Sequence, residues 1–258
     1  IAATGIDMSE AAYTGSSSED STISATSVSD ALNKDTTVTI QTNKSDGNIT
    51  VATGADIKKT SSGDSTLNLK AHQNIAVNGT IESTGGKLNV DLLSDSDGKS
   101  GGSINISSGT ITTKGGSATL HGGKDGYANT ETTGMDGIQL NSARITTDGG
   151  DITLQGSTSV ANDKGVLITG TSNVDAGTAG KVTIQAQNGQ AGNGLTMDTG
   201  STITTKDAAV TADQMVLGGT ITGQTTGTFT LGSLTRGTAI SLNGSAGLNL
   251  DTTKVTGF

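Results

Sequence analysis

The chain has 258 residues, of which 39 are Gly, and it contains no Pro, Cys or Trp and only two Tyr and two Phe. Its 15 basic and 24 acidic side chains give a net charge of −9, which argues against binding nucleic acid through clustered Lys and Arg. With two His and no Cys, it has almost no ligands for a zinc or iron–sulfur site, so we expect no cofactor. Any core must be built from Ile, Leu, Val, Ala and Thr.

Residues 1–35 show only a weak hydrophobic pattern and are predicted to form a lead-in or cap. The segment SVSDALNK (27–34) is the candidate helix here, because Ser27 precedes Asp30 by three positions, close to the spacing of a capping box. The chain does not start with Met, and its first residues hold no basic region followed by an apolar run. We therefore expect that no signal peptide remains and that the chain is an excised piece of a longer protein.

Short internal repeats follow this segment. Four stretches end alike, namely IESTGG (81–86), ITTKGG (111–116), ITTDGG (145–150) and ITTKDA (203–208). A run of alternating apolar and polar residues follows each Gly doublet. Because side chains i and i+2 of a strand share one face, each run predicts a half-buried strand. The residues expected to point inward include Leu67, Leu69, Ala71, Ile75, Val77, Leu88, Val90, Ile104, Ile106, Ile152 and Leu154.

Strands this short cannot bury an apolar face alone, whereas stacked copies form a common core. Three strands and three turns in 18–22 residues describe one coil of a parallel β-helix, and residues 36–258 would then hold about 11 coils. This all-β fold accounts for the high Gly content, because Gly readily adopts the backbone conformations that turns need. It also accounts for the absence of Pro, which would remove a backbone N–H from the hydrogen bonds between strands. The final TKVTGF looks like a further coil, so we expect the repeats to continue from or into a longer rod.

The longer repeat units look like the short unit with an insertion, at SDSDGKSG (94–101), GGKDGYANTETTG (122–134), GSTSVANDK (156–164) and QNGQAGN (187–193). Loops that project from a rigid scaffold commonly carry function. The 122–134 insertion contains Tyr127, beside Asp125 and Lys124, a set that could stack on a glycan and hydrogen-bond to it. These three are the candidate binding residues. The alternative is a loop in which Tyr127 has no role in binding.

The clearest repeat, STLNLKAHQNIAVNGTIESTGG (65–86), resembles the coils of the large exoproteins of Gram-negative two-partner secretion, the family of filamentous haemagglutinin and the high-molecular-weight adhesins. The resemblance is best over residues 36–206 and looser over 207–257. It implies a right-handed parallel β-helix, export through an outer-membrane translocator barrel, and a secreted or cell-surface location. It does not name a receptor, because the family includes adhesins, haem-acquisition proteins, cytolysins and toxins.

Groups suited to catalysis or metal binding are sparse. His72 and His121 both fall within alternating runs and are expected at outward polar positions. A β-helical polysaccharide-processing enzyme would need clustered carboxylates, Lys or Arg, and aromatic platforms for sugar. Carboxylates cluster at Glu19–Asp20 and at Asp95 and Asp97, but these lie in Ser- and Gly-rich loops with few aromatic residues. We therefore expect no catalytic residue and no metal site.

These features together predict a segment of a secreted bacterial surface adhesin that attaches to host cells, matrix or biofilm polysaccharide. The alternatives are a structural stalk that carries a distal functional domain, and a β-helical polysaccharide-processing enzyme. Glycosylation of the chain is a further option, because Asn-x-Ser/Thr acceptor sequences occur at Asn43, Asn48, Asn78, Asn105 and Asn243.

Overall fold

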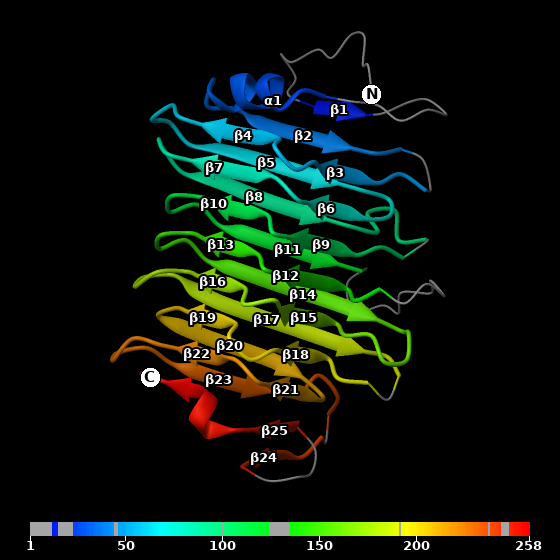
Figure 1. Ribbon diagram of the computed structural model, residues 1–258, viewed down its shortest axis with the longest axis vertical. Helices are drawn as coiled ribbons and strands as arrows, with labels where there is room; N and C mark the ends of the chain where they lie inside the picture. Colours follow the sequence, from blue (N-terminus) through cyan, green and yellow to red (C-terminus); the bar gives the residue numbers. More distant parts are fainter. Residues whose placement is uncertain are drawn as a thin grey trace.

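A computed structural model describes residues 12–14, 23–43, 46–99, 101–123, 135–190, 192–236, 238–243 and 248–258. In this part of the chain, nearly all regular structure is strand, with one α-helix and one short 3-10 helix, η1 (Thr252–Lys254). No helix in it is long and apolar enough to cross a membrane. The strands stack into a column with α1 at one end and the last strands at the other (Figure 1).

The first strand of every coil belongs to one nine-stranded parallel sheet, here called sheet A (Figure 1). Each strand pairs in register with its counterpart in the next coil, so that Leu67 lies beside Val90 and Ala118 beside Ile152. Sheet A consists of β1 (Ala12–Thr14), β2 (Thr37–Gln41), β5 (Ser65–Lys70), β8 (Leu88–Leu93), β11 (Ala118–Gly122), β14 (Ile152–Thr158), β17 (Lys181–Asn188), β20 (Asp207–Ala212) and β23 (Phe229–Gly232).

The second and third strands of the coils form two further parallel sheets. Sheet B has seven strands, β3 (Ile49–Val51), β6 (Ile75–Val77), β9 (Ile104–Ser107), β12 (Ile138–Asn141), β15 (Val166–Thr169), β18 (Leu195–Met197) and β21 (Met215–Leu217). Sheet C has eight, β4 (Asp56–Lys59), β7 (Thr80–Ser83), β10 (Thr110–Thr112), β13 (Arg144–Thr146), β16 (Asn173–Asp175), β19 (Thr202–Thr204), β22 (Thr220–Thr222) and β26 (Val255–Thr256). A separate pair, β24 (Ile240–Leu242) and β25 (Leu248–Leu250), lies near the C-terminal end.

Three parallel sheets visited in turn by one chain define a parallel β-helix, which confirms the predicted fold class. In the described residues, the number of coils is lower than the eleven expected. Seven complete three-strand coils run from β2 to β22, and β23 begins another. Register partners in sheet A lie as far apart as Ala118 and Ile152, and as close as Ala208 and Phe229. Most coils therefore exceed 18–22 residues, because insertions lengthen a coil without adding a strand.

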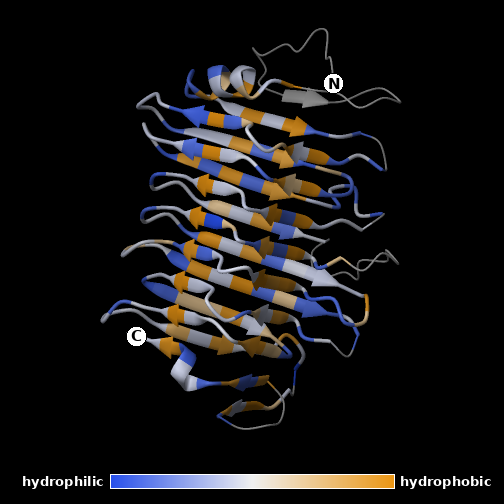
Figure 2. Cartoon of the chain, viewed as in Figure 1, coloured by the Kyte–Doolittle hydropathy of each residue, from blue (hydrophilic) through white to orange (hydrophobic). Residues whose placement is uncertain are grey.

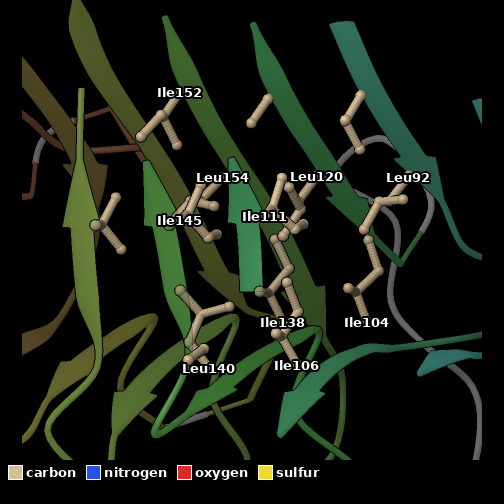
Figure 3. Packing of buried hydrophobic residues seen from close by; sticks show 14 of the residues in the cluster. Leu92, Ile104, Ile106, Ile111, Leu120, Ile138, Leu140, Ile145, Ile152 and Leu154 are labelled. Atoms are coloured by element: carbon tan, nitrogen blue, oxygen red, sulfur yellow. The ribbon is translucent and has the colours of Figure 1, made fainter. Parts of the chain in front are cut away.

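The core consists of columns of aliphatic side chains, one from each coil. Polar and apolar residues alternate along the strands (Figure 2), and the apolar ones pack inside the column (Figure 3). All the side chains predicted to point inward are buried. Burial of each Ile contributes about 1.5–3 kcal/mol, which stacked coils accumulate. One such column, in register along sheet C, contains Ile57, Ile81, Ile111, Ile145, Val174, Ile203 and Ile221.

The repeated Thr-x-Gly-Gly ending forms the corner between sheets C and A. In ITTDGG, the buried Thr147 hydroxyl donates to the carbonyl of Gly150 at 2.5 Å, and Thr113 donates to Gly116 at the same distance. Gly149 has φ +107°, a conformation that Gly adopts readily. A Cβ on Gly150 would lie 2.0 Å from the Gly116 carbonyl oxygen of the preceding coil. The first Gly of the doublet thus makes the turn and the second allows coils to approach closely.

Helix α1 (Ala25–Leu32) covers the N-terminal edge of sheet C. The helix begins two residues earlier than predicted, because Ser24 is the N-cap and accepts a hydrogen bond from the N–H of Ser27. Its Ser29 hydroxyl accepts the N–H of Lys58 at 2.9 Å. The Asn33 side chain beyond the helix accepts the N–H of Thr60. Side-chain oxygens of Ser29 and Asn33 therefore accept N–H groups at this edge of sheet C, where no preceding strand supplies carbonyls.

Candidate functional site

The long loops of the protein gather at a single corner of the coils, between sheets A and B, called here the loop corner. The connections from β8 to β9, β11 to β12, β14 to β15 and β17 to β18 all pass through it. Figure 1 shows the described parts of the β8–β9, β14–β15 and β17–β18 connections leaving the ends of the sheet A strands along one edge of the column. The corner between sheets B and C is much tighter, with only Gly109 and Ser108 between β9 and β10.

The four predicted insertions belong to connections between sheets A and B. Three of them begin later than expected, and the first of these is the 122–134 insertion, because β11 includes Gly122. Strand β14 continues to Thr158 and β17 to Asn188, so the loops start after these residues rather than at 156 and 187. The candidate binding residues Lys124, Asp125 and Tyr127 belong to the connection between β11 and β12, and they lie outside the described residues. Their proposed role stays a prediction.

Two of the stacked loops bring carboxylates together. Asp136, just before β12, accepts the N–H of Lys164 at 2.6 Å, and Lys164 belongs to the loop of the next coil. Burial raises the pKa of Asp136; the Lys164 N–H acts against this rise, and the nearby Asp163 carboxylate adds to it. Asn188, the last residue of β17, donates its side-chain N–H to the Asp163 carbonyl at 2.5 Å, which links a third coil to the other two. Three successive coils are therefore linked at this corner by polar contacts.

The loop after β8 contacts a histidine of the preceding coil. His72 follows the end of β5, and its Nδ1 lies 3.7 Å from the Oδ2 of Asp97. Placing His72 at an outward strand position was wrong, because the strand ends at Lys70 and His72 is in the corner, 21% exposed. His121, on β11, is at a partly exposed outward position as predicted. The sequence did not reveal the His72–Asp97 pair, because it depends on how the insertion folds back.

Several other acidic and amide side chains at the corners have structural partners. Asp64 accepts the N–H of Lys87, and Asp151 accepts that of Lys181, so each joins one coil to the next. Asn48 accepts the N–H of Asn74 in the same manner. Across the described ranges, no group of three or more His, Cys, Asp or Glu is arranged to hold a metal ion. Chemically, the loop corner offers hydrogen-bond donors, acceptors and mixed charges on a rigid support.

Comparison with known proteins returns no match: no protein-family model, no curated protein and no solved structure is similar to this chain.

Proposed function

We propose that this chain is a segment of a secreted bacterial surface adhesin, which attaches to host cells, matrix or biofilm polysaccharide through the loop corner. The observation that carries the proposal is the position of the long polar β8–β9, β14–β15 and β17–β18 connections along a single edge of a stiff column. Loops on a rigid scaffold are a common place for binding residues. The B–C corner, whose turns are short, serves as support.

The mechanism is the presentation of many weak contacts by one rigid body. Each sheet is a continuous parallel ladder, so neighbouring loops keep a spacing of about 4.8 Å per coil. Side chains such as Lys164 and Lys99 can donate hydrogen bonds to sugar hydroxyls or to a protein surface. Contacts that are weak singly become strong together when the support holds them in one geometry. No reaction is assigned to the chain.

Export through an outer-membrane translocator barrel of a Gram-negative bacterium is part of the same proposal. It rests on the resemblance of the 65–86 repeat to exoproteins of two-partner secretion. The absence of Cys from the sequence is compatible with export, since the fold needs no disulfide. Secretion of the chain fused to such a family's export domain, with and without the barrel partner, tests this part.

A structural stalk is the second candidate, because the register of sheet A continues without interruption from β2 to β23. Such a ladder would serve as a spacer for a distal functional domain even if no loop bound anything. A binding experiment distinguishes the two candidates, because a stalk does not attach to cells, matrix or polysaccharide on its own.

The test is a printed array of glycans, matrix proteins and biofilm polysaccharides, probed with the purified chain and with a 122–134 deletion. The proposal expects saturable binding by the native chain and its loss or reduction in the deletion. A variant with Thr153→Val, on the outer side of sheet A, is the control and should bind as the native chain does. Absence of binding across the array and to cultured cells would contradict the proposal and favour the stalk.

A further inference from the structure

The loop Ser94–Lys99 folds back onto the preceding coil. It leaves β8 and donates two backbone hydrogen bonds to the corner after β5, from the Asp95 N–H to Gln73 at 3.2 Å and from the Ser96 N–H to Ala71 at 2.9 Å. Both acceptors are backbone carbonyls beside His72. Exchange of these two amide protons therefore reports whether the loop is closed.

His72 and Asp97 face each other across this contact. Their side chains are 21% and 13% exposed, and the imidazole Nδ1 lies 3.7 Å from the carboxylate Oδ2. The Nδ1 atom is shielded from solvent and has no hydrogen bond at this distance. The other carboxylate oxygen accepts the N–H of Lys99 at 3.3 Å. A neutral imidazole thus gains little from the carboxylate, whereas an imidazolium would form a partly buried ion pair with it.

Several other charged groups belong to the segments packed against the pair. The β2–β3 loop contacts this corner, because the Gly47 carbonyl accepts the N–H of Gln73, and β11 contacts the loop through the His121 carbonyl. Within the described part of the chain, Asp97 is the carboxylate that lies at ion-pair distance from the His72 imidazole. The other charged or titratable residues on these segments and on the loop itself are Asp46, Lys70, Asp95, Lys99 and His121.

We propose that His72 and Asp97 form an acid-strengthened latch, which holds the 94–99 loop closed on the preceding coil more firmly as the pH falls from about 8 to about 5. Imidazole is the side chain that ordinarily takes up a proton in this range, while Asp carboxylates ordinarily stay ionised. Protonation of His72 therefore adds an attraction that is present only when the loop is closed. The inference does not depend on the adhesin proposal, because its test measures loop opening and not attachment.

The experiment is amide hydrogen exchange of the purified chain at pH 5.5 and 7.5, with rates corrected for the intrinsic pH dependence of exchange. We expect the Asp95 and Ser96 amides to be about three- to tenfold better protected at pH 5.5. The variants His72→Gln and Asp97→Asn should each abolish this difference. The amide oxygen introduced by Asp97→Asn can still accept the Lys99 N–H, so this variant removes the charge with little other change.

His121→Gln is the matched control, because it removes the other imidazole of the chain from an outward position on the same sheet. It should leave the pH effect intact. Equal protection at the two pH values in the native chain would overturn the latch. So would a pH effect that persists in Asp97→Asn. Circular dichroism of each variant verifies that the β-helix is retained.

Discussion

The ammonium of Lys59, a side chain that is fully buried, lies 3.6 Å from the carboxylate of Asp35. Lys59 is at the end of β4, where the alternation points its side chain inward. Its Nζ donates to the Ser61 carbonyl at 2.7 Å, to the Ser61 hydroxyl at 3.0 Å and to the Gly63 carbonyl. A buried cation is tolerated only with such partners. The lysine thus closes the first C–A corner beneath α1.

Replacement of Lys59 by Met should lower the free energy of unfolding by about 2–4 kcal/mol, because the Ser61 and Gly63 carbonyls lose a buried donor. The control is Lys58→Met. Lys58 is the preceding residue, but its side chain is 51% exposed and pairs with Asp56 at the surface. That change should alter stability by less than about 1 kcal/mol. Urea melts of both variants measure their free energies of unfolding. Equal losses of stability in the two variants would contradict the role assigned to Lys59.

Thr147→Val should destabilise the protein by about 1–2 kcal/mol, since the Gly150 carbonyl loses its buried hydroxyl donor. Thr153→Val, on the outer side of β14, is the control and should be close to neutral because Val suits a strand. Thermal unfolding of the two variants gives the comparison. If both variants have the same melting temperature as the native protein, the Thr147 hydroxyl does not stabilise the corner.

Asp136→Asn should raise stability at pH 7 and change it less at pH 3. Burial raises the pKa of Asp136, so the folded protein holds this proton more tightly than the unfolded chain does. The group's contribution is therefore present below its unfolded pKa of about 3.9 and is lost as the pH rises through the folded value. Asn removes the charge and keeps an acceptor for the Lys164 N–H. The gain should be about a few tenths of a kcal/mol after solvent screening.

Urea melts at the two pH values test this prediction. The matched variant is Asp151→Asn, because Asp151 also accepts an N–H from the next coil, that of Lys181, and it is exposed. It should show no comparable gain at pH 7. Loss of stability in Asp136→Asn at pH 7 would show that the carboxylate stabilises the corner as an anion.

The fold could be predicted from the sequence because each coil repeats the same local rules. Alternation assigned Leu67, Val90 and Ile152 to the core, and the Gly doublets marked the C–A corners. Each of these signals is local and is repeated, so an error in one coil does not affect the others. The number of coils depended on a different quantity, the length of each insertion, and an estimate based on the shortest units was too high.

The candidate site was predicted in part. The insertions were visible as interruptions of the repeat, but their shared position at the loop corner required the strand register. The His72–Asp97 contact and the burial of Lys59 depend on how loops fold against a neighbouring coil, about which local pattern carries no information. The residues placed first as binding candidates, Lys124, Asp125 and Tyr127, lie outside the described part of the chain and stay a prediction.

The most direct test of the account is the attachment of the purified chain to cultured host cells, compared with a variant whose loop corner is trimmed. In that variant, the 94–101 and 122–134 segments are each replaced by Ala-His-Gln-Asn, the short connection (71–74) of the 65–86 repeat, and circular dichroism verifies the β-helix. We expect saturable attachment by the native chain and its loss in the trimmed variant. Equal attachment by the two proteins would contradict it and would place the contacts on the faces of the sheets.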